Sequence, residues 1–328
     1  MNIACRPTTG VITFANRWDH FLARAGVNRM ARRVEPGLYG LGKPTAQTLV
    51  VVTANYRLSF DALRAALNGT DAYILVLNTQ GINVWCAAGE GTFGTDELVR
   101  QVEAAALAEV VNHRVLILPQ LGAPGVAAHE VKKRTGFKVE YGPVRAADLP
   151  AYLKTRQATP EMRRVRFTLA DRMTVALVDI LKPLPLMALV AVVLYFLGGP
   201  LPALAVILAT LAATALFPAL LPWLPTREFS TKGFILGGVV ALPLALAALG
   251  NPPALGWLPL ARAAMYLLAV PPAVAYLALL FTGSTTFTSR AGVRREIFAY
   301  IPVMAWMFGA GVVLALVVFA AQFWGGRA

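Results

Sequence analysis

Five apolar segments fill the second half of the chain and limit what it can fold into. They cover residues 183–199, 201–221, 233–250, 261–282 and 299–324. Most approach the roughly 20 residues that a helix needs to cross a bilayer. We therefore expect an all-α transmembrane domain of about five helices over residues 183–328. Its first helix starts near Met173 if Pro183 and Pro185 only kink it.

Basic residues between these segments predict the orientation of the domain. They gather in two loops, at 222–232 and 283–298: Arg227, Lys232, Arg290, Arg294 and Arg295. Cytoplasmic loops of membrane proteins retain such charges. We expect a multi-pass protein of the cytoplasmic (inner) membrane, with residues 1–180 in the cytoplasm and the C-terminus outside. The segments contain no acidic residue, which argues against a proton- or cation-coupled pump. The domain is then an anchor, with a pathway for a neutral or soft ligand as the alternative.

Residues 47–155 alternate strand and helix patterns, which favours a doubly wound α/β domain. The expected strands are 48–53, 73–78, 115–119 and 138–141, and the expected helices are 59–67, 95–111 and 123–135. Ligands bind beyond the carboxyl ends of the strands in such a domain. A basic extension, residues 1–46, precedes it, with a helix around 18–33 and a loop at 35–45. An amphipathic, arginine-rich connector, residues 156–182, follows it.

Charge and cysteine content exclude several classes of protein. The net charge is +13, but the basic residues cluster beside apolar segments, without the aromatic interleaving of a nucleic-acid platform. We expect no nucleic-acid partner. The two cysteines, Cys5 and Cys86, allow neither a disulfide framework nor a CxxC zinc site. The first residues lack the apolar stretch of a secretory signal.

Residues 83–95 carry the most specific chemistry. They read Asn-Val-Trp-Cys-Ala-Ala-Gly-Glu-Gly-Thr-Phe-Gly-Thr, after an apolar run that predicts a buried strand. Small residues follow Cys86, so that a large flat group could lie against the backbone. A thiolate is also a soft metal ligand. Cys86 is thus a candidate axial ligand beneath a planar metal cofactor, and the alternative is a small buried hydrophobic residue.

Other chemical signals are weak. His20, His113 and His129 are the histidines of the chain, and His129-Glu130 lacks the second histidine of a zinc-protease helix. We expect His113 and His129 on helix surfaces. The histidine motif Asp-x-His-x-x-Gly, which ligates cobalamin in other proteins, is missing. Gly89, Gly91 and Gly94 resemble a dinucleotide fingerprint only loosely.

Residues 83–95 resemble the cap-helix motif of the mercury-methylating corrinoid protein family (HgcA-type), whose core reads Asn-Val-Trp-Cys-Ala-Ala-Gly-Lys. That family is itself similar to the corrinoid subunit of the acetyl-CoA-pathway corrinoid iron–sulfur protein. Further segments fit the resemblance: Pro36-Gly37-Leu38-Tyr39, Val52-Thr53-Ala54-Asn55-Tyr56, Pro119-Gln120-Leu121-Gly122-Ala123, Tyr141-Gly142-Pro143-Val144 and residues 282–289. An α/β corrinoid domain followed by five spans distinguishes the mercury family from the soluble acetyl-CoA-pathway proteins.

The resemblance implies a corrinoid-dependent methyltransferase. Cys86 would be the catalytic residue and the lower axial ligand of cobalt, in a cobalamin whose benzimidazole tail is displaced. The cofactor-binding residues implied are Thr53, Asn55, Asn83, Val84, Trp85, Cys86, Ala87, Ala88, Gly89, Gly91, Thr92, Phe93, Gly94, Gln120, Leu121, Gly122, Tyr141, Gly142 and Pro143. The implied partners are a ferredoxin-like [4Fe-4S] protein that reduces cobalt, a folate-type methyl donor, and Hg(II) as acceptor. This chain has too few cysteines for an iron–sulfur cluster of its own.

The sequence departs from the motif at one position, because Glu90 stands where the family has lysine. Glu90 is either a solvated charge or a contact with the cofactor or the redox partner. Two further functions stay open beside methylmercury formation. One is a corrinoid methyl carrier for a different acceptor, and the other is a non-catalytic membrane permease or sensor. The sequence does not choose between methyl transfer as a carbanion and as a radical.

Overall fold

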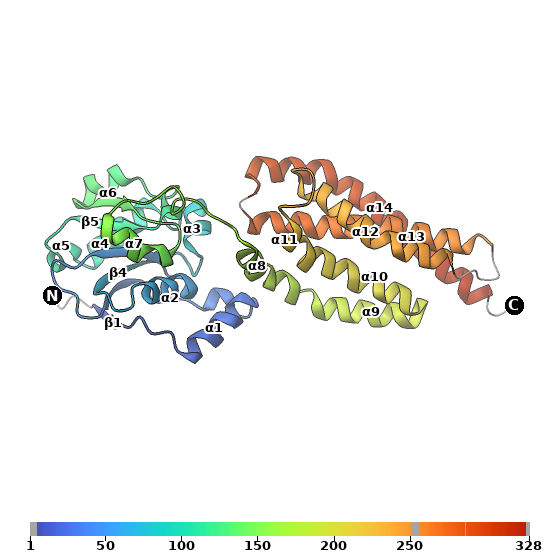
Figure 1. Cartoon of the computed structure of the whole chain (residues 1–328), viewed down its shortest axis with the longest axis horizontal. Coiled ribbons are helices and arrows are strands. Elements are labelled where there is room, and N and C mark those ends of the chain that lie inside the picture. Colours follow the sequence, from blue (N-terminus) through green and yellow to red (C-terminus); the bar gives the residue numbers. More distant parts are fainter. Residues whose placement is uncertain (1–4, 251–255, 286, 326–328) are drawn as a thin grey trace. The chain divides into compact units, whose positions relative to one another are not determined.

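The computed structural model describes residues 5–250, 256–285 and 287–325. Residues 1–4, Thr286 and the side chain of Arg290, on which some of the expectations above fall, lie outside the described residues. The chain divides into two compact units, Met1–Arg166 and Phe167–Ala328. Figure 1 shows an α/β unit and a helical unit. Each is described by itself.

Unit 1 contains a mixed six-stranded sheet with the order β1-β2-β4-β3-β5-β6. The strands are β1 (Arg6–Thr8), β2 (Gly37–Leu41), β3 (Val50–Ala54), β4 (Ala72–Leu77), β5 (Val115–Leu118) and β6 (Lys138–Tyr141). β4, β3, β5 and β6 run parallel, and β2 pairs antiparallel with β4. The four strands expected from the sequence are present, each within two residues of the expected bounds.

The parallel strands create a topological switch point. From β3 the chain crosses to β4 on one side, and it then returns past β3 to form β5 on the other. The connections leave the carboxyl ends of β3 and β5 in opposite directions, which opens a crevice there. This crevice is the place where the fold favours a ligand.

Helices cover both faces of the sheet. Successive residues of β3 point to opposite sides, so each belongs to the core of one face. Val50 and Val52 pack with α3 (Val84–Glu90), α4 (Thr95–Ala104), α5 (Leu107–Val110) and α6 (Ala128–Thr135). Val51 packs with α2 (Arg57–Ala66) and α7 (Leu149–Thr155). All five residues of β3 are buried, which explains its continuous apolar pattern. Short 3-10 turns, η1 (Arg29–Ala31), η2 (Gln120–Gly122) and η3 (Ala146–Asp148), complete the unit.

The structure corrects several expectations for unit 1, and the helix expected at 123–135 begins only at Ala128. The loop expected at 35–45 contains β2, because pairing with β4 over a long sequence separation overrides the weak strand propensity of a glycine-rich segment. The helix expected at 95–111 is broken at Ala106, whose φ is +42°. This turn lets both Leu107 and Val111 reach the core. The helix expected at 18–33 is α1, which spans Phe14–Arg24 after a capping box at Thr13.

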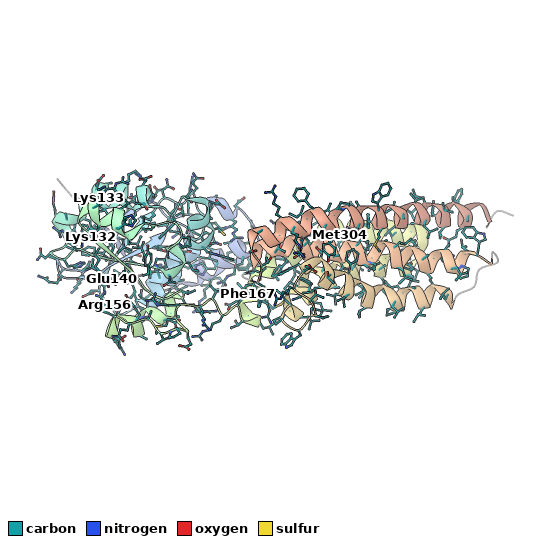
Figure 2. The ribbon with its side chains drawn as sticks, turned by 90° about the horizontal axis from the view of Figure 1, so that it is seen from above. Lys132, Lys133, Glu140, Arg156, Phe167 and Met304 are labelled. Atoms are coloured by element: carbon teal, nitrogen blue, oxygen red, sulfur yellow. The ribbon has the colours of Figure 1, made fainter. Side chains whose placement is uncertain are left out.

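Side chains at the far end of the sheet form ordinary surface ion pairs. Arg156, which ends α7, lies 3.5 Å from Glu140 of β6, and Lys138 lies 3.1 Å from the same carboxylate (Figure 2). Lys132 and Lys133 belong to the basic last turn of α6, where positive charge complements the helix dipole. None of these contacts belongs to the crevice.

Unit 2 is helical throughout its regular elements. They are α8 (Leu169–Leu181), α9 (Leu184–Gly198), α10 (Pro200–Leu211), the π-helix η4 (Ala212–Leu216), α11 (Phe217–Leu220), α12 (Phe229–Leu249), α13 (Leu258–Leu280), the 3-10 turn η5 (Phe281–Ser284) and α14 (Arg290–Gly325). Within the described residues, four stretches are long and apolar enough to cross a membrane: 200–220, 229–249, 258–284 and 291–323. α8 and α9, bent by 52° at Pro183, make a fifth if they act as one span.

Small residues bring α12 and α13 close together. A Cβ atom added at Gly233 would lie 2.5 Å from the Cα of Ala275, and one at Gly237 would lie 2.6 Å from the Cα of Pro271. Such contacts let membrane helices pack backbone against backbone. On α14, Met304 is also buried (Figure 2).

Polar contacts join the two basic loops at one end of unit 2. The carboxylate of Glu296 is buried and accepts hydrogen bonds from Ser230 N (2.9 Å) and Ser230 Oγ (3.0 Å). Arg295 lies 3.2 Å from Glu228. Since these pairs connect the start of α12 with the start of α14, both loops lie on the same side of the apolar helices.

Candidate functional site

Cys86 lies in the first turn of α3, close to the crevice. Asn83 is the N-cap, and its Oδ1 accepts a hydrogen bond of 3.0 Å from the backbone N of Cys86. The side-chain amide of Asn83 also donates to Cys86 Sγ at 3.6 Å. Cys86 is a free thiol of intermediate exposure. The cap therefore fixes the sulfur while leaving it accessible.

α3 has a buried face and an exposed face. Val84, Ala87 and Ala88 pack into the core of unit 1. Trp85, Gly89 and Glu90 are exposed around Cys86, and we call these four residues the exposed face of α3. Positions 86, 89 and 90 follow the i, i+3, i+4 spacing of neighbours on a helix surface. Since Gly89 has no side chain, a flat group could approach the sulfur from this face.

The other small residues of the motif hold α3 in place. A Cβ atom added at Gly122 would lie 2.5 Å from the ring of Phe93, which is fully buried. One added at Gly125 would collide with the carbonyl oxygen of Phe93 and lie 3.1 Å from the Cα of Ala88. Gly122 and Gly125 thus allow the loop after β5 to touch α3. Ala87, Ala88 and Phe93 pack beneath the exposed face, and Gly89 adds no side chain to it.

A cleft of ≈ 340 Å³ occupies the switch point beside α3. We call it the switch-point cleft. Its walls come from the ends of β3 and β5, from α2, from the start of α3 and from the loop after β6. Of the expected site residues it gathers Thr53, Asn83, Val84, Trp85, Leu121 and Pro143. Ser59 and Arg145, which the sequence did not single out, also line it.

Asn55 has a structural role at the end of β3. Its side chain is buried, and its Oδ1 accepts hydrogen bonds from Thr79 N (3.0 Å), Thr79 Oγ1 (2.9 Å) and Gly81 N (2.9 Å). These bonds tie the loop after β4 to β3, immediately before α3. Asn55 therefore positions the cap residue Asn83 rather than facing the cleft.

The loops after β5 and β6 are connected in the same way. The hydroxyl of Tyr141 donates to the carbonyl of Val126 at 2.6 Å, and burial raises its pKa above the ordinary value. Gly142 N donates to Leu118 O at 2.8 Å. The Gln120 side chain accepts a 2.5 Å hydrogen bond from Arg163, in the connector. Gln120, Tyr141 and Gly142 thus connect the loops beside the switch-point cleft without being among the residues that line it.

Sequence reasoning missed Glu97 of α4. Its carboxylate accepts hydrogen bonds from the backbone N of Asn78 (2.6 Å), from Gln101 (2.9 Å) and from Arg100 (2.7 Å). Burial pushes the pKa of Glu97 upward, but these hydrogen bonds outweigh burial and hold the pKa below its ordinary value. Glu97 borders a shallow hollow of ≈ 550 Å³, which also collects Gly91 and Thr92. An acidic residue early in a helix, followed by Arg100 at i+3, is the signal that could have indicated it.

The histidines take no part in the site. His129 is exposed on α6, as expected. His113 instead lies in the turn before β5, where its ring bonds Thr48 O at 2.9 Å and Val115 N at 3.3 Å. In the described part of the chain, no group of three or more His, Cys, Asp or Glu side chains is placed to hold a metal ion.

Comparisons with known proteins match unit 1. Residues 28–153 match the family described as the CO dehydrogenase/acetyl-CoA synthase delta subunit. The gamma subunit of the acetyl-CoA decarbonylase/synthase complex of Methanopyrus kandleri is 30% identical over 128 residues, which is 38% of this chain and 27% of that protein. The gamma subunit of Archaeoglobus fulgidus is 32% identical over 124 residues, 37% of this chain and 26% of that protein. The corrinoid/iron-sulfur protein large subunit of Moorella thermoacetica is 26% identical over 129 residues, 39% of this chain and 28% of that protein.

This chain is related to the acetyl-CoA-pathway corrinoid proteins. The matches span about a quarter of the length of these relatives. The family match holds β2 to β6, α3 and the switch-point cleft, and it ends before unit 2. The relationship therefore concerns the α/β unit and the site around Cys86.

Proposed function

We propose that this protein is a membrane-anchored corrinoid protein that transfers methyl groups, with Cys86 as the lower axial ligand of cobalt. One observation carries the proposal. The accessible thiol of Cys86 lies on the exposed face of α3 beside the switch-point cleft. The segment around it is related to corrinoid proteins.

The residues around Cys86 fit such a cofactor. A macrocycle needs an open surface above the sulfur, which Gly89 and the exposed side of α3 offer. The volume of the cleft, ≈ 340 Å³, is at the low end for small-molecule pockets, so it suits a side arm rather than a whole macrocycle. Thr53, Ser59 and Asn83 provide polar groups there for the displaced tail.

The chain contributes orientation and electron donation. Bound cobalt would supply the chemistry of accepting a methyl group and passing it on. The Cys86 thiolate, a soft ligand, would hold bound cobalt and supply it with electron density. Asn83 orients the sulfur by donating one hydrogen bond to Sγ and accepting another from the backbone N of Cys86. α3 is held rigidly by Phe93 and the loop that carries Gly122, so the sulfur keeps its position.

A cofactor-binding assay tests the ligand role directly. The full chain in detergent is mixed with cobalamin, and the optical spectrum is recorded for the wild type and for Cys86→Ala, Cys86→His and Cys5→Ala. The wild type and Cys5→Ala should show a thiolate–cobalt spectrum. Cys86→Ala should lose it, and Cys86→His should show an imidazole ligand. A spectrum unchanged in Cys86→Ala would refute the proposal.

A second proposal concerns the acceptor, for which Hg(II) is a candidate. Residues 83–89 are identical to the motif of the mercury-methylating family, and an apolar helical unit follows the matched region. The alternative is a methyl carrier for another acceptor, which the names of the relatives favour. A non-catalytic permease or sensor is the third possibility.

An assay in cells distinguishes these three functions. The cells would express the chain with a ferredoxin-like [4Fe-4S] partner as the proposed electron donor, and a folate-type compound is the proposed methyl source. Methylmercury formed from Hg(II) by the wild type and abolished in Cys86→Ala supports the mercury proposal. Thiolate-ligated cobalamin without methylmercury would point to another acceptor. Absence of cobalamin binding would leave the permease or sensor.

A further inference from the structure

Helix α1 is oriented opposite to an ordinary surface helix. Asn16, His20 and Ala23, spaced i, i+4, i+7, face the rest of unit 1. Phe14, Trp18 and Phe21, with the same spacing, face outward. Surface helices of soluble domains normally bury the apolar face and expose the polar one. The polar face of α1 is instead the one that packs against the protein.

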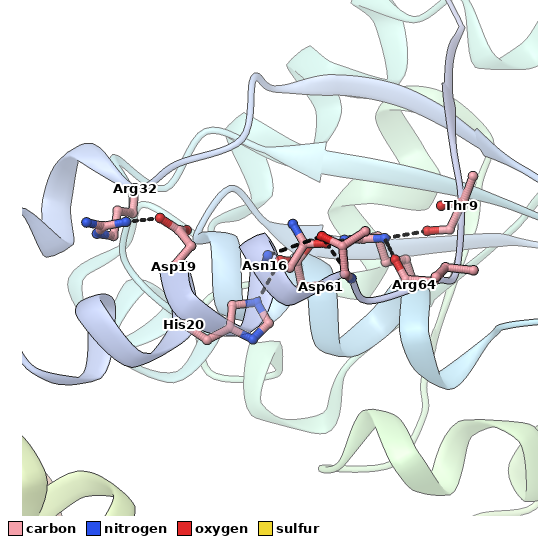
Figure 3. Close-up of polar contacts among 9 residues, drawn as sticks. Thr9, Asn16, Asp19, His20, Arg32, Asp61 and Arg64 are labelled. Atoms are coloured by element: carbon pink, nitrogen blue, oxygen red, sulfur yellow. Dashed lines mark hydrogen bonds and ion pairs between the residues drawn. The ribbon is translucent and has the colours of Figure 1, made fainter.

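Buried charged groups of α2 hold the polar face. His20 Nε2 lies 2.7 Å from the fully buried carboxylate of Asp61 (Figure 3). Arg64 bonds Asp61 at 2.7 Å and Asn16 at 3.1 Å. It also donates to the carbonyls of Thr9 (2.6 Å) and Val11 (2.7 Å), before the helix begins. Since breaking such a buried ion-pair network is costly, α1 cannot easily rotate to hide its aromatic side chains.

The outward face is aromatic. Phe14 is 82% exposed, Trp18 is 55% exposed and Phe21 is 45% exposed. The rings of Trp18 and Phe21 stack with centroids 5.4 Å apart, and Val11 is exposed just before the helix. Contiguous exposed apolar groups mark an interaction site. We call Phe14, Trp18 and Phe21 the aromatic face of α1.

Arginines are frequent in the segment that carries the aromatic face. Five lie between residues 14 and 33, against one aspartate, Asp19, which is paired with Arg32. Arg17 and Arg24 are exposed on α1 itself, one helical position before Trp18 and three after Phe21. Aromatic residues on one face with arginines beside them are typical of helices that lie in the headgroup layer of a membrane. The positive charge is complementary to anionic lipid headgroups.

We propose that α1 binds the surface of a bilayer that contains anionic lipid, with Phe14, Trp18 and Phe21 at the boundary between headgroups and acyl chains. A bilayer is available to α1, because the described residues of unit 2 include four helices long and apolar enough to span one. α1 is then a second, peripheral membrane contact, made by unit 1. This role is independent of the cofactor and of the acceptor.

Fluorescence of the full chain tests the proposal. The protein is reconstituted into phosphatidylcholine vesicles with and without phosphatidylglycerol. Subtracting the spectrum of Trp18→Phe from that of the wild type isolates Trp18. In anionic vesicles its emission should be blue-shifted and quenched by brominated lipid, roughly twofold or more above its quenching in neutral vesicles. Trp85, isolated through Trp85→Phe, is the matched control, because it is an exposed tryptophan of the same unit that should stay open to acrylamide.

Two double variants separate the contributions of the face and of the charges. Phe14→Ser with Phe21→Ser should return Trp18 to water in both kinds of vesicle. Arg17→Gln with Arg24→Gln should reduce the difference between anionic and neutral vesicles. These side chains are exposed, so the fold should be preserved. A Trp18 signal that is red-shifted, quenched by acrylamide and insensitive to brominated lipid in anionic vesicles would overturn the proposal and point to a protein partner for the aromatic face.

Discussion

The side chain of Asn83 caps the helix that carries Cys86, with its Oδ1 3.0 Å from Cys86 N and its Nδ2 3.6 Å from Cys86 Sγ. One amide thus both begins α3 and contacts the sulfur. Whatever binds at Cys86 depends on a residue three positions earlier.

Substitution of Asn83 distinguishes its two roles, the helix cap and the contact with the sulfur of Cys86. Asn83→Ala removes both bonds and should cost about 1 kcal/mol of stability, as the loss of an N-cap does. Asn83→Ser keeps the cap but not the contact with sulfur, so stability should be nearly restored. Thermal unfolding in detergent measures the first effect and the cobalamin spectrum the second. Equal unfolding temperatures for the alanine and serine variants would contradict the capping role.

Glu97 makes unit 1 sensitive to acid. Its pKa is below the ordinary value in the folded protein, so ionised Glu97 stabilises the fold above about pH 4.3, the unfolded value. That contribution is lost as the pH falls through the folded pKa. Glu97→Gln should cost on the order of 1–2 kcal/mol at neutral pH and progressively less in acid. Glu103→Gln, an exposed glutamate on the same helix, is the control and should change little. A pH-independent difference between Glu97→Gln and the wild type would argue against this account.

Gly125 is where the loop after β5 touches α3. In Gly125→Ala the new Cβ atom would collide with Phe93 O, so the loop or the helix must move, at a cost of about 1–3 kcal/mol. The cobalamin affinity should fall with the stability. Gly238→Ala on α12, where nothing lies within 4 Å of the added atom, is the control. Denaturation curves compare the two variants, and equal curves would exclude tight packing at Gly125.

Glu90 lies one helical turn from Cys86 on the exposed face of α3. Glu90→Lys restores the motif residue and reverses the charge beside the sulfur. If position 90 contacts the cofactor or the redox partner, the variant should methylate Hg(II) faster than the wild type at unchanged protein stability. Equal rates would make Glu90 a solvated surface residue. An active variant beside an inactive wild type would indicate that this chain serves another acceptor.

The membrane orientation is tested by reporter fusions. Contacts between Arg295 and Glu228 and between Glu296 and Ser230 put the two basic loops at one end of unit 2. Fusions after Arg227 and Arg294 should therefore give the same result, and the positive charges predict that it is cytoplasmic. A fusion after Arg327 should report the outside. Opposite results at Arg227 and Arg294 would contradict the five-span topology.

Local sequence patterns were sufficient to predict those elements whose structure depends only on their own residues. Val50–Ala54 and Val115–Leu118 are short apolar runs, and their burial on both faces made them recognisable as strands. The bend at Pro183 was predictable as well, since a proline within a helical run removes a backbone hydrogen bond and kinks or breaks the helix. These features depend on residues that are near each other in sequence.

Features that depend on distant partners were not predictable. Gly37–Leu41 becomes a strand by pairing with β4 and with β1, both more than thirty residues away. The sequence placed Cys86 and its neighbours in one motif, but it could not show that Ala87 and Ala88 face the core while Gly89 faces out. It also gave no sign that Gly122 and Gly125 serve α3. Which glycine meets a ligand and which meets a helix depends on the direction of each residue in three dimensions.

The length of α14 also has a mechanical consequence. Its 36 residues, at 1.5 Å each, make a rod of about 54 Å, whereas the hydrocarbon core of a bilayer is about 30 Å thick. If α14 crosses a bilayer along its normal, more than a dozen residues of continuous helix stand in the headgroups or in water. Since Glu296 and Arg295 fasten the first turns of that rod to the start of α12, the excess is braced at that end. A bilayer of different thickness would then meet a rigid helix rather than a flexible loop. The hydrophobic mismatch would have to be relieved by the surrounding lipids.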